Sequence, residues 1–120
     1  MSNSNSVITG NLFAALPSPH DGEAFEEILR CRNVRIERIV SSARPDPTLY
    51  DQPQDDWVCL LQGEAEHWVA GQGVHLQPGD HCFIPARTPH RVVRTSPEPP
   101  CIWLAIHIDP GGAICATSAR

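Results

Sequence analysis

The stretch that decides the fold is PGDHCFIPARTPH, residues 78–90. It opens with a turn signal, Pro78–Asp80, because proline and glycine both favour tight bends. The run Cys82–Ile84 is apolar and partly β-branched, which predicts a short strand. Pro85 ends that strand, since proline has no N–H to give to a central ladder. His90 then begins the next strand, directly after a second bend, and we expect it to point into a barrel.

This spacing resembles the second motif of the cupins, in which glycine, proline and histidine recur at fixed intervals. Gly79, Pro85 and His90 stand at the intervals that the motif requires. Arg87 occupies the place where the family usually has its second glycine, and Arg94 the place of its asparagine. The resemblance implies an all-β fold, a small jelly-roll barrel, and a site built around the histidine.

The first cupin motif is only partly kept upstream. Gly63 matches it by identity, and Asp56 stands where the family has glutamate. Tyr50 and Gln52 occupy the positions of its two histidines. The resemblance therefore covers the fold, over roughly residues 34–108, more fully than it covers the family's metal site.

Length and composition fit one domain. The chain has 120 residues, 41% of them hydrophobic, and a formal net charge of −5, as in ordinary globular domains. We expect the domain over 12–110, with tails at 1–11 and 111–120. Neither a basic patch nor a long apolar run is present, so we expect no nucleic-acid partner and no membrane.

Twelve prolines and eight glycines punctuate short runs, which is typical of an all-β protein. One helix is expected before the barrel, over about residues 19–30. Its basis is the helical spacing of four apolar residues, Ala24, Phe25, Ile28 and Leu29.

The cysteines indicate a reducing compartment. There are five, which is an odd number, and no two are spaced as a CxxC pair: Cys31, Cys59, Cys82, Cys101 and Cys115. We interpret them as reduced core residues. A cytoplasmic location follows from this interpretation.

His90 and Asp56 are the first candidates for chemistry. Imidazole is the commonest metal ligand and also a general base near neutral pH. Asp56 shares the parity of Val58 and Leu60, which turns its carboxylate inward, where burial requires a partner. With Gln52 these two residues form the predicted metal set. It would hold one divalent ion (iron, manganese, nickel or zinc) at low occupancy, because a glutamine oxygen is a weak ligand.

The same pocket has a metal-free interpretation. Arg94 shares the parity of His90, and an inward guanidinium would receive an anionic ligand and disfavour a nearby cation. Tyr50 and His90 would then be the catalytic pair that moves protons. Gln52, His67 and His107 are further candidates for ligand binding, although core or surface positions are the alternative for both histidines.

Three functions remain open at this point. The first is an enzyme with a weakly held metal that acts on a small organic acid or sugar-like molecule. The second is a metal-free module that binds a small anion, and the third is a structural or regulatory barrel without chemistry. An apolar outer sheet face, assigned to Trp57, Leu61 and Trp103, predicts a homodimer.

Overall fold

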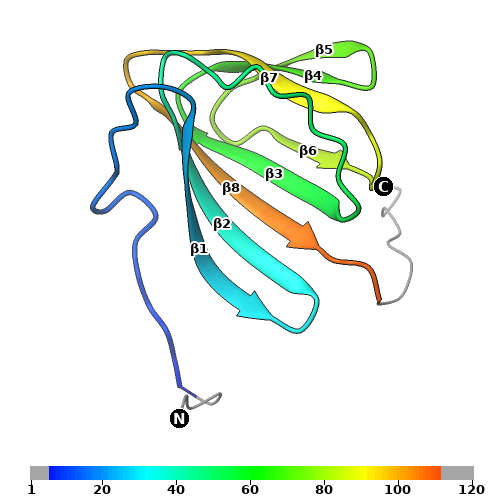
Figure 1. Cartoon of the computed structure of the whole chain (residues 1–120). Coiled ribbons are helices and arrows are strands. Elements are labelled where there is room, and N and C mark those ends of the chain that lie inside the picture. The colour runs from blue at the N-terminus through cyan, green and yellow to red at the C-terminus, as the bar shows by residue number, and fades with distance from the viewer. Residues whose placement is uncertain (1–5, 112–120) are drawn as a thin grey trace.

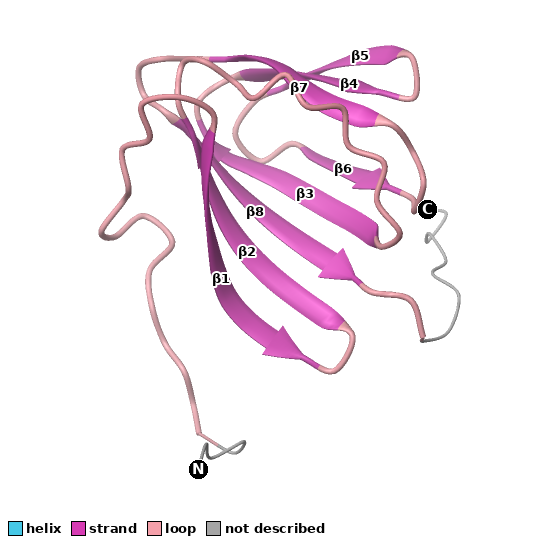
Figure 2. Ribbon diagram, viewed as in Figure 1, coloured by secondary structure: helices cyan, strands magenta, loops and turns pink. Residues whose placement is uncertain are grey.

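The computed structural model describes residues 6–111, which form eight strands in two antiparallel sheets (Figures 1 and 2). The strands are β1 (Glu23–Cys31), β2 (Val34–Ser41), β3 (Asp55–Gln62), β4 (Ala65–Val69), β5 (Gln72–Leu76), β6 (His81–Ile84), β7 (His90–Thr95) and β8 (Cys101–Ile108). The first sheet has the order β1-β2-β8-β3-β6 and the second β5-β4-β7. Expectations for residues 1–5 and 112–120, Cys115 included, lie outside the described residues.

The predicted all-β jelly-roll fold is confirmed. The two sheets face each other, and their inner side chains make a core of Leu60, Ala65, Leu76, Cys101 and Trp103. The indole Nε1 of Trp103 donates to Ser41 Oγ at 2.9 Å, which satisfies the polar atom that this core buries. Trp103 is therefore an inner residue, and its assignment to the outer face was wrong.

The predicted helix over 19–30 is also wrong, because this segment forms β1 and pairs with β2. The register of the pair shifts between Glu27 and Leu29, which leaves Ile28 as the extra residue of a bulge. A bulge interrupts the two-residue alternation of a strand. Phe25 pairs with Ile39 and Leu29 with Ile36, so the bulge puts these two apolar residues on opposite faces of the strand, whereas their four-residue interval also fits one face of a helix.

Both motif glycines adopt the left-handed backbone conformation that favours glycine. Gly63 has φ +89°, and a Cβ there would lie 2.8 Å from Cys101 Sγ. Gly79 has φ +93° with nothing within 4 Å of such a Cβ. Arg87, at the family's second glycine position, also has positive φ, +61°. Arg87 thus holds a backbone conformation that glycine adopts more readily than arginine.

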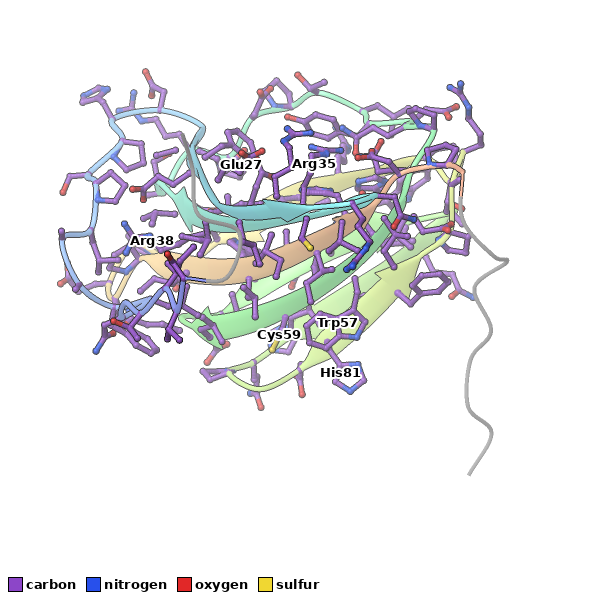
Figure 3. All side chains as sticks on the ribbon, turned by 90° about the horizontal axis from the view of Figure 1, so that it is seen from below. Glu27, Arg35, Arg38, Trp57, Cys59 and His81 are labelled. Carbon is purple, nitrogen blue, oxygen red and sulfur yellow. The ribbon has the colours of Figure 1, made fainter. Side chains whose placement is uncertain are left out.

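Arg38 holds the N-terminal segment against the first sheet (Figure 3). Its guanidinium donates to the carbonyl oxygens of Leu12 and Ala14, at 3.1 and 2.6 Å, and to Glu26 Oε1. Arg38 is only 5% exposed, so these bonds compensate a buried charge.

The other end of the first sheet keeps an apolar outer face. Trp57 on β3 stacks on His81 of β6, with ring centroids 5.5 Å apart, and Figure 3 shows both side chains pointing away from the sheet. The described cysteines are free thiols, but only Cys101 is buried and Cys31 is exposed, so the prediction of core positions was wrong for Cys31. Within residues 6–111, no helix is long and apolar enough to span a membrane.

Candidate functional site

A cavity of about 460 Å³ lies between the two sheets. Its walls come from β1, β2, β3, β6 and β8 of the first sheet, from β4 and β7 of the second, and from the connection 42–54. Many ligand sites have this size and position. Asp56, His67, His90 and His107 line it, and each is at most 9% exposed. Tyr50 and Gln52 line it as well, so the cavity gathers six of the seven predicted site residues, all but Arg94.

Tyr50 is held beside His90 by two backbone hydrogen bonds. Tyr50 N donates to His90 O at 2.8 Å, and His90 N donates to Tyr50 O at 2.9 Å. The two rings stack with centroids 5.8 Å apart. Burial, followed by the nearby carboxylate of Asp46, raises the pKa of the Tyr50 phenol. The phenol therefore stays protonated at neutral pH and is available as a proton donor.

His90 has one ring nitrogen fixed and the other free. Its Nδ1 lies 2.9 Å from the carbonyl oxygen of Thr88. A carbonyl oxygen only accepts hydrogen bonds, so Nδ1 carries the proton. In the neutral ring the lone pair is then on Nε2, which lies 4.0 Å from Asp56 Oδ2. That separation is too long for a hydrogen bond.

Asp56 finds its partner in His107, not in Arg94. His107 Nδ1 lies 2.6 Å from Asp56 Oδ1, and Nε2 lies 2.6 Å from Glu37 Oε1. Burial lowers the pKa of His107, but the hydrogen bonds to the two carboxylates outweigh it and raise that pKa to about 9. The hydrogen bond to His107 lowers the pKa of Glu37. At neutral pH the cavity wall therefore contains an imidazolium between two carboxylates.

Glu37 was missed in the sequence, although a signal was present. Along β2, alternate residues line the cavity: Arg35, Glu37, Ile39 and Ser41. The alternation of a strand puts these residues on one face. A half-buried carboxylate at the centre of that face favours a cationic partner, which only the three-dimensional structure identifies as His107.

His67, one of the candidates for ligand binding, faces the cavity. It is 4% exposed, and its Nδ1 is buried without a hydrogen-bond partner in the described structure. Its ring meets that of His90 edge-on, with centroids 5.6 Å apart. Burial, followed by the proximity of His90, lowers the pKa of His67 to about 4. His67 is therefore a neutral imidazole at physiological pH.

Arg94 does not face the cavity, so its expected inward orientation was wrong. The register of β7 against β4 shifts between Glu66 and His67, which makes Val93 an extra residue and reverses the alternation after Val92. Arg94 is consequently exposed and pairs with Glu66 at 3.2 Å. Thr95 is the buried residue instead.

Two members of the predicted metal set are engaged in hydrogen bonds within the protein. Asp56 is bound to His107, and the side-chain oxygen of Gln52 accepts a hydrogen bond from Gln54 at 2.9 Å. Across residues 6–111, no group of three or more His, Cys, Asp or Glu side chains is arranged to hold a metal ion. The position opposite His90 is flanked by a fixed organic cation, which opposes the binding of a second cation.

Comparisons with known proteins agree with this fold. The family model of the cupin domain matches residues 41–107, so the chain belongs to the cupin family. A crystal structure from Ralstonia eutropha JMP134, provisionally named as a mannose-6-phosphate isomerase, is 38% identical, with 86% of this chain and 99% of that chain covered and a TM-score of 0.77.

Two further solved structures share the fold at low identity. A cupin superfamily protein from Desulfitobacterium hafniense DCB-2 is 18% identical, with 78% and 84% of the two chains covered and a TM-score of 0.67. KdgF from Halomonas sp. is 18% identical, with 72% and 79% covered and a TM-score of 0.64. No curated protein matches the chain significantly.

Proposed function

We propose that this cupin is a metal-independent enzyme that moves a proton on a small polar organic molecule bound in the cavity. The observation that carries the proposal is the state of His90, whose Nδ1 is fixed by Thr88 O while Nε2 remains free at the cavity wall. A nitrogen with a free lone pair beside a ligand cavity is the arrangement that a general base requires.

Each neighbouring group has a role in this reaction. His90 takes the proton at Nε2, and the imidazolium that forms is stabilised by Asp56 Oδ2, 4.0 Å away. His107 and Glu37 hold Asp56 in place and compensate its burial. Tyr50, whose raised pKa keeps its phenol protonated, supplies a proton to the reacting group from its position beside His90.

Proton transfer of this kind serves isomerisation and elimination. An isomerase that converts an aldose into a ketose removes a proton from one carbon and returns it to the next. The provisional name of the Ralstonia eutropha protein, which is 38% identical, is that of an isomerase and supports this choice. Small organic acids and sugar-like molecules are accordingly the substrates to test first.

The test is proton exchange in D2O, followed by NMR on a panel of small hydroxy acids and sugars. We expect loss of a carbon-bound proton signal with the wild type in excess EDTA. His90→Gln and Tyr50→Phe should each slow this exchange about 100-fold or more. Arg94→Gln is the matched control, because Arg94 lies outside the cavity, and it should not change the rate. Exchange that EDTA abolishes and a metal restores would contradict the proposal.

Two further properties belong to the proposal. We place the protein in the cytoplasm, since its described cysteines are free thiols. We also propose a homodimer formed through the outer face of β3, β8 and β6. Half-buried apolar residues gather there, including Trp57, Phe83, Leu104 and Ile106.

A further inference from the structure

We infer that the inner end of the cavity is built to bind neighbouring hydroxyl groups on an uncharged carbon chain, as in a polyol or a sugar. This inference rests on the site of the proposed function and names the class of molecule that the site takes. The carboxylate ligand expected from the sequence is not the class that these residues fit.

Two acceptors face each other without a donor between them. Asp56 Oδ2 and His90 Nε2 are 4.0 Å apart, while the other oxygen of Asp56 and the other nitrogen of His90 are already hydrogen-bonded. A carboxylate oxygen and an imidazole lone pair both only accept. A ligand must therefore bring hydrogen-bond donors to this pair.

His67 adds a nitrogen that the protein leaves unsatisfied. Its Nδ1 is buried without a hydrogen-bond partner among residues 6–111, which costs free energy. The ring lines the cavity and lies against His90, with centroids 5.6 Å apart, so a ligand at His90 Nε2 lies close to the His67 ring. A neutral imidazole nitrogen donates in one tautomer and accepts in the other. A hydroxyl group matches either tautomer because it does both.

Charged ligands fit these groups less well. A carboxylate brings no donor to Asp56 and His90 and is repelled by Asp56. Arg35 lines the cavity, but its Nε and Nη2 are taken by the two oxygens of Asp109, at 3.0 Å each. An ammonium group donates but cannot accept, and the imidazolium of His107 lies on the other side of Asp56. A hydroxyl avoids both conflicts.

Apolar side chains beside these polar groups suit the carbon chain of such a ligand. Val58, Ile84, Val92 and Trp103 line the same cavity. The indole of Trp103 meets the ring of His67 edge-on, with centroids 6.1 Å apart. Small-molecule sites are usually lined by apolar side chains together with a small number of precisely placed polar groups.

Calorimetric titration tests the inference with three probe classes: erythritol and xylose as uncharged polyhydroxyl compounds, succinate as the anion, and putrescine as the cation. We expect the polyhydroxyl compounds to bind the wild type at least 10-fold more tightly than the other two. His67→Phe keeps a ring and removes both nitrogens, and it should weaken their binding about 10-fold. His75→Phe, on the exposed strand β5, is the matched control and should bind as the wild type does.

A measurement on the wild type covers the case in which His67→Phe fails to fold. Saturation with xylose should shift the ring 15N resonances of His67, whereas putrescine and succinate should not. Tighter binding of succinate or putrescine, no binding by any probe, or an unmoved His67 resonance would each overturn the inference. If xylose binds at His67 but no carbon-bound proton exchanges, the proposed reaction fails and this inference stands. If protons exchange on a carboxylate that has no hydroxyl groups, the proposed reaction stands and this inference fails.

Discussion

Asp56 on β3 and His107 on β8 stand directly opposite each other in the antiparallel register, and their side chains meet at 2.6 Å. Neighbouring strands fix such cross-strand pairs, so the contact is set by the sheet and not by a flexible loop. On the other side of β8, Glu37 of β2 reaches the second nitrogen of the same ring. The strand order β2-β8-β3 thereby places one imidazolium between two carboxylates.

This arrangement predicts how stability depends on pH. The folded pKa of His107, about 9, lies above the ordinary value of 6.5, so the folded state holds the proton more tightly than the unfolded chain. The resulting stabilisation is complete below pH 6.5 and is lost as the pH rises through 9. Its upper bound is about 3 kcal/mol in the free energy of unfolding. Urea titrations at several pH values between 6 and 10 measure it.

The control for this prediction is His107→Gln, which cannot hold a proton. We expect the variant to be less stable than the wild type at pH 6.5 and the difference to shrink toward pH 10. Other groups that titrate over this range contribute to both proteins and cancel in the comparison. A difference that stays constant with pH would show that His107 is not protonated in the folded state.

The two motif glycines predict different costs for the same substitution. Gly63→Ala brings a Cβ to within 2.8 Å of both Cys101 Sγ and Ser96 Oγ, whereas at Gly79 nothing lies within 4 Å. Both positions carry the penalty of positive φ, about 1–2 kcal/mol. We therefore expect Gly79→Ala to lose about that much stability and Gly63→Ala about 3 kcal/mol or more. Equal losses in urea unfolding would contradict the role of the Cys101 contact.

The features that depend on the spacing of nearby residues were predicted correctly from the sequence. The side-chain orientations that depend on the register between strands were not. Gly79, Pro85 and His90 predicted the turn, the strand and the inward histidine, because these follow from a few adjacent residues. The orientation of Arg94 was missed, since the bulge in β7 that reverses the alternation is visible only against β4.

The same reason accounts for the errors in β1 and for the missed partner of Asp56. The apolar residues of β1 recur at a helical interval, and the pairing with β2 that makes the segment a strand is not visible in that interval. Glu37 and His107 are 70 residues apart in the chain. No local pattern connects them, and only the strand order brings them together.

Arg87 predicts a stabilising substitution. It holds φ +61° at the position where the family usually has glycine, and a residue with a Cβ is strained there. Arg87→Gly removes this strain but adds freedom to the unfolded chain. The exposed pair with Asp51, 3.7 Å apart, contributes little. We expect a net gain of about 0.5–1 kcal/mol in the free energy of unfolding.

The matched control for Arg87→Gly is Arg91→Gly. Arg91 is also exposed but lies within strand β7, where glycine weakens the strand. This second variant should lose stability in the same urea titration. A loss of stability in Arg87→Gly as well would mean that the positive φ of Arg87 carries no strain.

The proposed homodimer predicts that a charge at Trp57 gives a monomer. Trp57 lies on the outer face of β3 beside other apolar residues, and a stable dimer buries about 1,600 Å² in total, mostly around such aromatic side chains. Size-exclusion chromatography with light scattering should give twice the chain mass for the wild type at micromolar concentration. For Trp57→Glu it should give the mass of one chain. Val93→Glu is the control, because Val93 is 47% exposed on β7 of the other sheet, and it should remain dimeric. A monomeric wild type would show that the proposed dimer does not form. Dissociation by both substitutions alike would show that the interface is not specific to the face of Trp57.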